Sequence, residues 1–268
     1  MLSAHGPALV LTGAGMSTDS DIPDYRGPDG TRRVTPMHLQ EFVASSEARR
    51  RYWARSYVGW RRFDSARPND AHHLVTRLQQ EGLLGSVITQ NVDGLHQGAG
   101  TRDVVELHGS LVGVLCLTCG ARVERRDLDA RMAEQNPGFD VVSDEIRPDG
   151  DIRLDAVDVE RFVAPRCQEC GADTLKPDVV FFGGAVAKPL VEHCFALTDA
   201  APSLLVLGSS LQVMSGLRFV RRAARLGRPV ALITRGPSRG DDLVDHRVDG
   251  ELTPSLRRLL TLVEPAAV

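Results

Sequence analysis

Six short apolar runs, each closed by small or polar residues, are the feature that most constrains the fold of this 268-residue chain. Runs of four to eight apolar residues between turn residues are typical of strands buried on both faces of a parallel sheet. Helical patterns lie between several of the runs, and this alternation predicts an α/β fold with a doubly wound parallel sheet. The runs span residues 8–13, 86–91, 103–109, 178–184, 204–210 and 229–236.

Two of the helical segments have clear ends. Residues 69–84 have the apolar spacing of a helix that packs on a sheet, with Asn69 or Asp70 as its N-cap. Residues 216–227 form a second such segment, which Gly227 closes.

Two stretches interrupt the alternation of strands and helices. Residues 31–68 contain an aromatic- and arginine-rich helical insertion. Residues 112–177 contain two cysteine pairs and an acidic, turn-rich segment, which favours a small module with a long loop over a second core. We therefore predict one main domain from residues 1–111 and 178–268, interrupted by a module over residues 112–177.

Composition narrows the class of protein. The net charge of −3 and the pI of about 6.2 give no indication of a nucleic-acid surface or of binding to an anionic membrane. No apolar run reaches the length of a membrane span, and residues 1–7 lack the pattern of a secretory signal. The expected location is the cytoplasm.

Four of the five cysteines form two C-x-x-C pairs. In a reducing compartment, two such pairs indicate a structural zinc site rather than disulfides, because four thiolates can close a tetrahedron around Zn²⁺. An all-thiolate site leaves no position for a reacting water, so one Zn²⁺ per chain should hold the module together. The predicted ligands are Cys116, Cys119, Cys167 and Cys170, while Cys194 should be a buried apolar residue.

The residues after the predicted strands are small, polar or titratable, and ligands of open α/β sheets bind at the carboxyl ends of strands. After the first strand, Gly13 and Gly15 begin a G-x-G-x-x-T sequence that allows a tight turn and an anion nest of backbone N–H groups. This pattern alone is weak evidence for a nucleotide, since glycine-rich turns are common. Asp24, Tyr25 and Arg26 follow on a loop that could cover a ligand.

Three further strand ends have two interpretations each. The sequence QNVDG at residues 90–94 is either a turn or a set of polar ligand contacts. The sequence GSS at residues 208–210 is either a tight turn or a contact to phosphate and ribose. His108 is either a hydrogen-bonded polar residue of the core or a general base, which its ordinary pKa near neutrality would suit.

Taken together, these motifs resemble the sirtuin family of NAD-dependent protein deacylases. The sequences GAGMSTDSDIPDYRG, TQNVDGLH, ELHGSL, the paired C-x-x-C, LKPDVVFFGG and LGSSLQV match the motifs of that family in order, over roughly residues 8–249. The resemblance implies a Rossmann-like domain, NAD as co-substrate, acyl-lysine proteins as substrates, and release of nicotinamide and 2′-O-acyl-ADP-ribose. YWARSYVGWRRF, GSSLQVMSGLRF and the long insert between the cysteine pairs are similar to the class II branch.

The resemblance also implies roles for individual residues. His108 is the implied general base, and Asn91 the second catalytic residue. The NAD contacts comprise the glycine-rich loop, the covering loop and the later strand ends: Gly13, Ala14, Gly15, Met16, Asp24, Tyr25, Arg26, Gln90, Asn91, Asp93, Gly208, Ser209, Ser210, Thr234, Arg235 and Gly236. Val180, Phe181, Phe182 and Gly183 would contact the substrate backbone as an added strand, together with the SSLQVMSG segment.

The sequence departs from the family pattern in three places. Asp21 stands where the family usually has glycine, which either alters the mobility of the loop or faces solvent. Thr234 and Arg235 stand where asparagine usually follows the late strand, which weakens the adenine-side assignment. The third departure is the length of the insert over residues 120–166, whose role the sequence does not define.

The acyl group is a separate question. Tyr52 and Arg55 form a Y-x-x-R pair, which binds the acyl carboxylate in one sirtuin branch and is otherwise explained by packing and a solvated face. The sequence favours a longer acyl group, acidic or branched, over acetyl.

Three other functions are considered. A mono-ADP-ribosyltransferase would use the same NAD pocket. A non-catalytic NAD-binding scaffold is disfavoured because His108, Asn91 and Asp93 are all present. A dehydrogenase is disfavoured because no helix is expected directly after the glycines.

Overall fold

The computed structural model describes residues 6–27, 29–141, 148, 152 and 154–263. The chain divides into two compact units, of which the first contains Met1–Arg33, Arg67–His108 and Val186–Val268, and the second contains Val34–Ala66 and Gly109–Ala185. Among the residues so described, no helix combines the length and the apolar character that crossing a bilayer demands.

The first unit is built on a parallel six-stranded sheet in the order β3-β2-β1-β7-β8-β9. The order reverses between β1 and β7, whose last residues Thr12 and Leu207 are paired. In open α/β sheets, ligands bind outside the carboxyl ends of the strands at such a switch point. The strands span Val104–Glu106 (β3), Leu84–Thr89 (β2), Ala8–Thr12 (β1), Leu204–Leu207 (β7), Val230–Thr234 (β8) and His246–Asp249 (β9).

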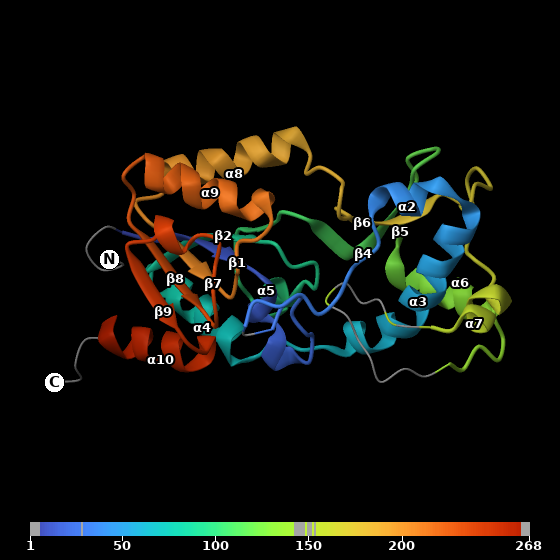
Figure 1. Cartoon of the computed structure of the whole chain (residues 1–268), viewed down its shortest axis with the longest axis horizontal. Helices are drawn as coiled ribbons and strands as arrows, with labels where there is room; N and C mark the ends of the chain where they lie inside the picture. Colours follow the sequence, from blue (N-terminus) through green and yellow to red (C-terminus); the bar gives the residue numbers. More distant parts are fainter. Residues whose placement is uncertain (1–5, 28, 142–147, 149–151, 153, 264–268) are drawn as a thin grey trace. The chain divides into compact units, whose positions relative to one another are not determined.

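Helices cover both faces of this sheet, as the doubly wound prediction requires (Figure 1). One face packs against α4 (Asp70–Gln80) and α10 (Leu252–Val263), and the other against α8 (Lys188–Ala200) and α9 (Met214–Arg225). Asn69 caps α4 by accepting hydrogen bonds from the N–H groups of Ala71 and His72. Cys194 is fully buried between α8 and the sheet, as predicted for a small apolar residue.

The structure corrects the sequence analysis at three strands. The run over residues 178–184 is not a strand of the main parallel sheet, because β6 (Leu175–Val179) pairs antiparallel with β4 (Gly109–Cys116) in a separate sheet. Two further strands, β4 and the edge strand β9, were not predicted from the sequence. The sixth parallel strand is therefore β9 and not the 178–184 run.

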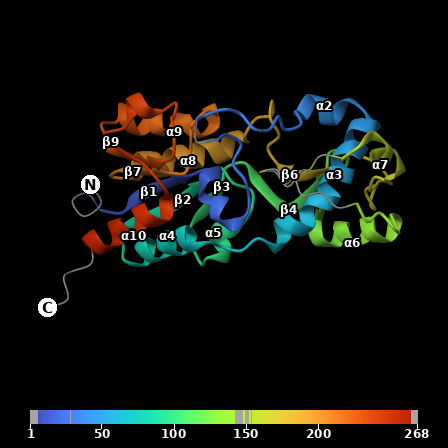
Figure 2. The same ribbon diagram turned by 60° about the horizontal axis from the view of Figure 1, so that its bottom comes forward.

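The second unit contains a three-stranded antiparallel sheet in the order β5-β4-β6, with β5 at Arg122–Glu124. The long helix α3 (Ser46–Ser65) follows the short α2 (Leu39–Ala44) in this unit. Two further helices, α6 (Arg125–Gln135) and α7 (Ala156–Arg161), come from the segment between the cysteine pairs (Figure 2).

This second unit has a hydrophobic core of its own, so the expectation of a loop module without a second core is wrong. Trp53 and Phe42 pack there with Leu128 of α6 and Phe162 after α7, all nearly inaccessible to solvent. Arg125 is buried in the same core, where its guanidinium lies 4.9 Å from the ring centre of Trp60 and donates to the Ser56 carbonyl. The apolar residues of this core are widely spaced in the sequence and are interrupted by the acidic segment. No continuous apolar pattern therefore indicated a second core.

Candidate functional site

The two loops that follow β1 and β7 interlock at the switch point of the first unit. A Cβ atom on Gly13 would lie 2.8 Å from Cβ of Ser209, and one on Gly208 would lie 2.6 Å from the backbone N of Met16. Gly208 also has a φ of +60°, which few other residues adopt. The glycines are therefore required by the close approach of the two loops.

Most backbone N–H groups of the loop after β1 already donate hydrogen bonds to carbonyls of the protein. The N–H of Gly15 donates to the Gly208 carbonyl, and the N–H of Met16 donates to the Gly13 carbonyl, each at 2.9 Å. Ala14–Met16 and Thr18–Ser20 form two 3₁₀ turns, and no α-helix starts directly after the glycines. The anion nest predicted here is consequently smaller than the sequence suggested, because two of its N–H groups already have acceptors.

Gln90 connects three strand ends. Its backbone N–H donates to the carbonyl of Thr12 at 3.0 Å, and its side-chain Nε2 donates to the same carbonyl at 3.1 Å. Nε2 also donates to Oγ of Ser209 at 2.9 Å. The amide of Gln90 thus fixes the loops after β1 and β7 to the end of β2.

Asn91, Ser17 and Asp93 form a hydrogen-bonded chain next to the glycine loop. The Asn91 amide donates to the Gly13 carbonyl at 3.1 Å and to Oγ of Ser17 at 3.0 Å, and Ser17 donates to the Asp93 carboxylate at 2.6 Å. Burial raises the pKa of Asp93, while the hydrogen bonds from Ser17 and from the Leu95 N–H oppose that shift. Ser17 was missed by the sequence analysis, although it lies inside the G-x-G-x-x-T sequence.

His108 is held through both of its ring nitrogens. Nδ1 lies 2.8 Å from the carbonyl oxygen of Gln90, and Nε2 lies 2.8 Å from Oγ of Ser215. Burial lowers the pKa of His108 below its ordinary value, the Arg218 guanidinium lowers it further, and the Gln90 carbonyl acts in the opposite direction. His108 is therefore a mostly buried imidazole that stays neutral at pH 7.

The covering loop contains no helix between Asp21 and Gly27. Arg33 forms an ion pair with Asp24 at 2.9 Å, and Nη1 of Arg26 donates to the Gly30 carbonyl at 3.0 Å. Burial raises the pKa of Asp24, which the charges of Arg33 and Arg235 oppose. Asp24 and Arg235, predicted from distant parts of the sequence, are thus electrostatic neighbours.

Asp21 faces solvent and has a φ of +61°, in the left-handed region. That conformation explains why glycine suits the position and why aspartate, which tolerates it better than most residues, can replace it. Of the two explanations offered for Asp21, the solvent-facing one agrees with the structure.

The later strand ends are tied together by Arg247. Its guanidinium donates to the carbonyls of Thr234 and Gly236, while the N–H of Gly236 donates to Asp249. The carbonyl of Ser210 accepts from the N–H of Arg239. These contacts order the loop after β8 at the same edge of the sheet as the glycine loop.

The predicted acyl-binding residues lie in the second unit. Tyr52 is buried, with its ring 5.3 Å from that of Phe42 and 5.2 Å from that of Phe181. Arg55, one turn further along α3, is half-buried. The packing explanation therefore accounts for the ring of Tyr52, and a role for Arg55 at the acyl group remains a prediction.

Residues 180–183 follow β6 and lead into a turn, in which the N–H of Gly184 donates to the Phe181 carbonyl at 2.9 Å. The carbonyl of Phe182 accepts from the N–H of Leu39 at 2.8 Å, and Gly183 has a φ of +78°. Beside them, Nζ of Lys176 donates to the carbonyls of Pro177 and Val179 and lies 4.6 Å from the ring centre of Phe181. Burial lowers the pKa of Lys176 to about 8.

The four paired cysteines converge as the zinc prediction requires. Their sulfur atoms all lie within 4.8 Å of one another, with Cys116 3.7 Å from Cys170 and Cys119 3.7 Å from Cys167. A tetrahedral ion with Zn–S bonds of about 2.3 Å places its sulfurs about 3.8 Å apart, so the spacing fits Zn²⁺.

The two cysteine turns have the same geometry. In each, the N–H of a glycine in the left-handed region donates at 2.9 Å to the carbonyl of the first cysteine: Gly120 to Cys116, and Gly171 to Cys167. Paired turns of one shape present their sulfurs symmetrically to a single ion.

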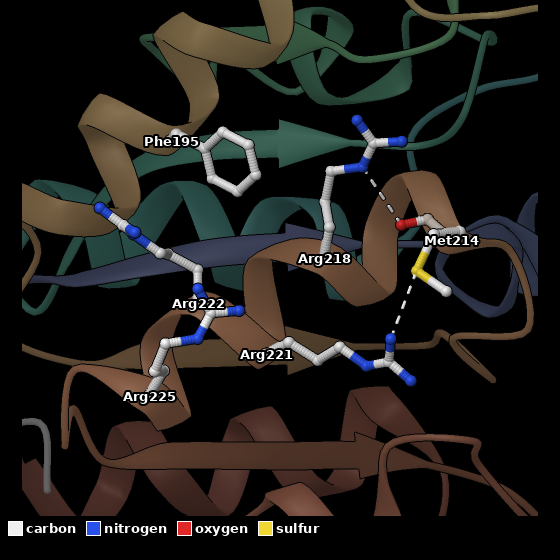
Figure 3. A pocket seen from close by; sticks show the side chains of 6 residues that line it. All are labelled: Phe195, Met214, Arg218, Arg221, Arg222 and Arg225. Atoms are coloured by element: carbon white, nitrogen blue, oxygen red, sulfur yellow. Dashed lines mark hydrogen bonds between the residues drawn. The ribbon is translucent and has the colours of Figure 1, made fainter.

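A groove of about 460 Å³ lies on the first unit, between α8 and α9 (Figure 3). Its walls are Phe195 and Met214 with four arginines of α9: Arg218, Arg221, Arg222 and Arg225. Arg222 forms an ion pair with Asp199 through two hydrogen bonds, at 2.7 and 2.8 Å. The groove contains none of the residues predicted for NAD, but Met214 belongs to the SSLQVMSG segment and the charge of Arg218 acts on His108.

All residues predicted for NAD and for catalysis lie in the first unit, and those predicted for acyl binding and for zinc lie in the second unit. Two hydroxyls of the first unit, Ser17 and Ser215, join the predicted set through the hydrogen bonds described above. The insert over residues 120–166 contributes α6 and α7, and part of it lies outside the described residues.

Comparison with known proteins gives a consistent result. Residues 13–215 match the model of the Sir2 family. The chain is 56% identical over 252 residues to "NAD-dependent protein deacetylase 1" of Streptomyces coelicolor, covering 94% of this chain and 84% of the relative. It is 44% identical over 255 residues to "NAD-dependent protein deacylase Sirt4" of Drosophila melanogaster, covering 92% and 81%.

A solved structure agrees with these sequence matches. The structure described as "Sir2-p53 peptide-NAD+" superimposes with a TM-score of 0.77 at 28% identity, covering 97% of this chain and 95% of that one. The similarity therefore extends over both units.

Proposed function

The chain belongs to the Sir2 family, and on this premise we propose how it works as an NAD-dependent protein lysine deacylase. NAD supplies an electrophilic ribose carbon with nicotinamide as its leaving group. The protein must hold that ribose, exclude water, and provide a base for the ribose hydroxyl that later attacks the acyl carbon.

The observation that carries the proposal is the state of His108. The Gln90 carbonyl can only accept a hydrogen bond, so Nδ1 of His108 carries the proton and Nε2 carries the lone pair. Burial and the Arg218 charge keep the ring neutral at pH 7. His108 is therefore available as a base through Nε2.

The neighbouring network supports the orientation of the base. Asn91 and Asp93 are fixed by Ser17, and Gln90 is fixed by Ser209 and Thr12, so these side chains are held in place before substrate arrives. We assign the nicotinamide ribose and its carboxamide to Gln90, Asn91 and Asp93. We assign the phosphates to the interlocked loops at Gly13 and Gly208.

The zinc ion has no part in these steps. Its four thiolate ligands, Cys116, Cys119, Cys167 and Cys170, leave no open coordination position, so the ion would stabilise the second unit. The structure carries the donor set, and the fit of the sulfur spacing supports the assignment.

For the acyl group we propose a preference for longer chains, acidic or branched, over acetyl. The relative from Drosophila melanogaster is named a deacylase and that from Streptomyces coelicolor a deacetylase, so this preference and the class II branch rest on the sequence motifs alone. Arg55 is the candidate partner for an acyl carboxylate, because the ring of Tyr52 is buried against those of Phe42 and Phe181. A cytoplasmic location stays a prediction from the sequence.

The test is mass spectrometry of a peptide panel. Acetyl-, succinyl-, glutaryl-, methylglutaryl- and lipoyl-lysine peptides are incubated with NAD and either the wild type or His108→Ala. We expect acyl-ADP-ribose with the wild type, at least one longer chain turned over faster than acetyl, and a loss on the order of 10²- to 10⁴-fold in kcat for the variant.

Two other outcomes would change the proposal. Turnover that is highest for acetyl would remove the acyl preference while leaving the deacylase intact. Nicotinamide release without any loss of acyl group, accompanied by ADP-ribose on protein, would favour the mono-ADP-ribosyltransferase and remove the role of His108.

A further inference from the structure

The lone pair of His108 that the proposed chemistry needs is already occupied. Because Nδ1–H donates to the Gln90 carbonyl, the neutral ring can only accept at Nε2. The hydroxyl of Ser215, 2.8 Å away, must therefore be the donor in that contact. In the free protein, the lone pair of His108 therefore accepts a hydrogen bond from the Ser215 side chain, which we call the cap.

The cap comes from the first turn of α9, which is fixed in place by several contacts. Ser215 is the second residue of α9. The next residue, Gly216, lies against Gln90, since a Cβ there would be 2.5 Å from the Gln90 Oε1. One turn on, Nε of Arg218 donates to the Met214 carbonyl at 3.3 Å (Figure 3). The hydroxyl of Ser215 and the charge of Arg218 are therefore presented to His108 by one rigid element.

We propose that Ser215 is a positioning residue, which caps Nε2 of His108 in the free enzyme and fixes the plane of its ring until a ribose hydroxyl replaces it. This inference rests on the proposed function of His108. When the ribose hydroxyl attacks, its proton passes to Nε2 and its oxygen forms the new bond to the acyl carbon. Ser215 keeps its own proton throughout, so it is not itself a base.

The groups around His108 determine how removal of the cap should act. The charged group that acts on the ring is Arg218 of α9, and the Gln90 carbonyl and the Ser215 hydroxyl are its hydrogen-bond partners. In the imidazolium form, Nε2–H donates to the Ser215 oxygen, and hydrogen bonds from a charged donor are roughly twice as strong as neutral ones. Ser215 therefore favours the charged form, and its loss should lower the pKa of His108.

The first experiment uses the free protein, without NAD or peptide. The ¹⁵N shifts of His108 are titrated by NMR in the wild type, Ser215→Ala and Ser215→Thr, with Ser255→Ala on α10 as the matched control and His108→Gln for assignment. We expect Ser215→Ala to lower the pKa of His108 by about half a unit to one unit. Ser215→Thr, which keeps a hydroxyl, and Ser255→Ala should titrate like the wild type.

The second experiment adds kinetics. The acid limb of the pH profile of kcat/KM should move to lower pH in Ser215→Ala by the same amount as the NMR pKa, and Ser215→Thr should restore it. The NMR titration contains no substrate, so an unchanged pKa of His108 in Ser215→Ala overturns the cap even if deacylation is confirmed. A shifted pKa in a protein that shows no deacylation would leave the cap in place and overturn the proposed function instead.

Discussion

At residue 13 the backbone admits no side chain larger than a hydrogen atom. A methyl group there would meet Cβ of Ser209 at 2.8 Å and the carbonyl oxygen of Gly208 at 2.9 Å, and neither atom can swing away. We expect Gly13→Ala to lower stability by about 1–3 kcal/mol and to raise KM for NAD at least about tenfold, because the two loops must separate. Urea unfolding and steady-state kinetics measure both effects.

Gly85→Ala is the control for this prediction. Gly85 lies in β2, and the nearest atom to an added Cβ is 3.7 Å away, an ordinary contact. Equal KM values for NAD in Gly13→Ala and the wild type would show that the interlocked loops do not bind the co-substrate.

Single residues differ in how far the sequence predicts them. Gly13, Gln90, Asn91 and His108 were predictable because each follows closely after a strand of the parallel sheet, and parallel strands bring their carboxyl ends to one edge. The contacts of Ser17 and Ser215 were not predicted, although both lie inside the quoted motifs, because a serine acquires its hydrogen-bond partners only through tertiary contacts. Assignments of a ligand to these residues remain predictions.

Among the elements, α4 and α5 (Leu95–Gly98) share a pair of buried histidines. His72 and His96 are almost fully buried, with ring centres 5.0 Å apart. Burial lowers the pKa of His72 to about 3 and that of His96 to about 4. Nε2 of His72 and Nδ1 of His96 find no acceptor or donor among the described residues, which agrees with neutral rings.

This pair predicts loss of stability in acid. The unfolded chain binds a proton at each histidine below about pH 6.5, while the folded chain does not until about pH 3–4, so stability falls as pH falls through that window. Each buried histidine should cost about 1.4 kcal/mol per pH unit there. His72→Gln retains a capping-box side chain for α4. The variant should lose the contribution of one histidine to the decrease of stability with falling pH.

The measurement is the free energy of unfolding in urea at several pH values between 7 and 4.5. A uniform loss of stability in His72→Gln reports on packing alone and does not bear on the titration. Parallel curves of stability against pH for the variant and the wild type would contradict the prediction.

The 178–184 run shows why elements are harder to place than residues. A short apolar run fits a buried parallel strand, but the observed strand β6 starts earlier, at Leu175, and alternates Leu175 and Pro177 inward with Lys176 and Asp178 more exposed. That alternation is typical of a half-buried antiparallel strand, and a proline is tolerated where a strand has one neighbour only. The missed strand β9 is mostly exposed and has too few apolar residues to stand out.

At the scale of the whole molecule, each of the two units has its own hydrophobic core, and the unfolding of each can be followed by a different spectroscopic signal. Both tryptophans, Trp53 and Trp60, lie on α3 in the second unit, so tryptophan fluorescence reports on that unit alone. The first unit contributes its parallel sheet and helices to the far-ultraviolet circular dichroism.

Removal of zinc should therefore separate two transitions. In Cys119→Ser or after chelation, we expect zinc content to fall from about one per chain to near zero, and the fluorescence midpoint to drop by about 10 °C or more. A dichroism transition of the first unit should persist at higher temperature. Cys194→Ala, which removes the fifth cysteine from α8, should keep its zinc and its fluorescence midpoint. A single transition that moves as one in both signals would show that the units do not unfold separately.

The burial of Lys176 has a further consequence for an enzyme that acts on modified lysines. The chain has two lysines, and the amine of Lys176 is held by two carbonyls and a phenylalanine ring, whereas that of Lys188 is 88% exposed. Reactive acyl donors in its surroundings thus meet one exposed lysine, Lys188, and one half-buried lysine, Lys176. With two lysines in 268 residues, the chain offers few positions at which acylation could make the enzyme its own substrate.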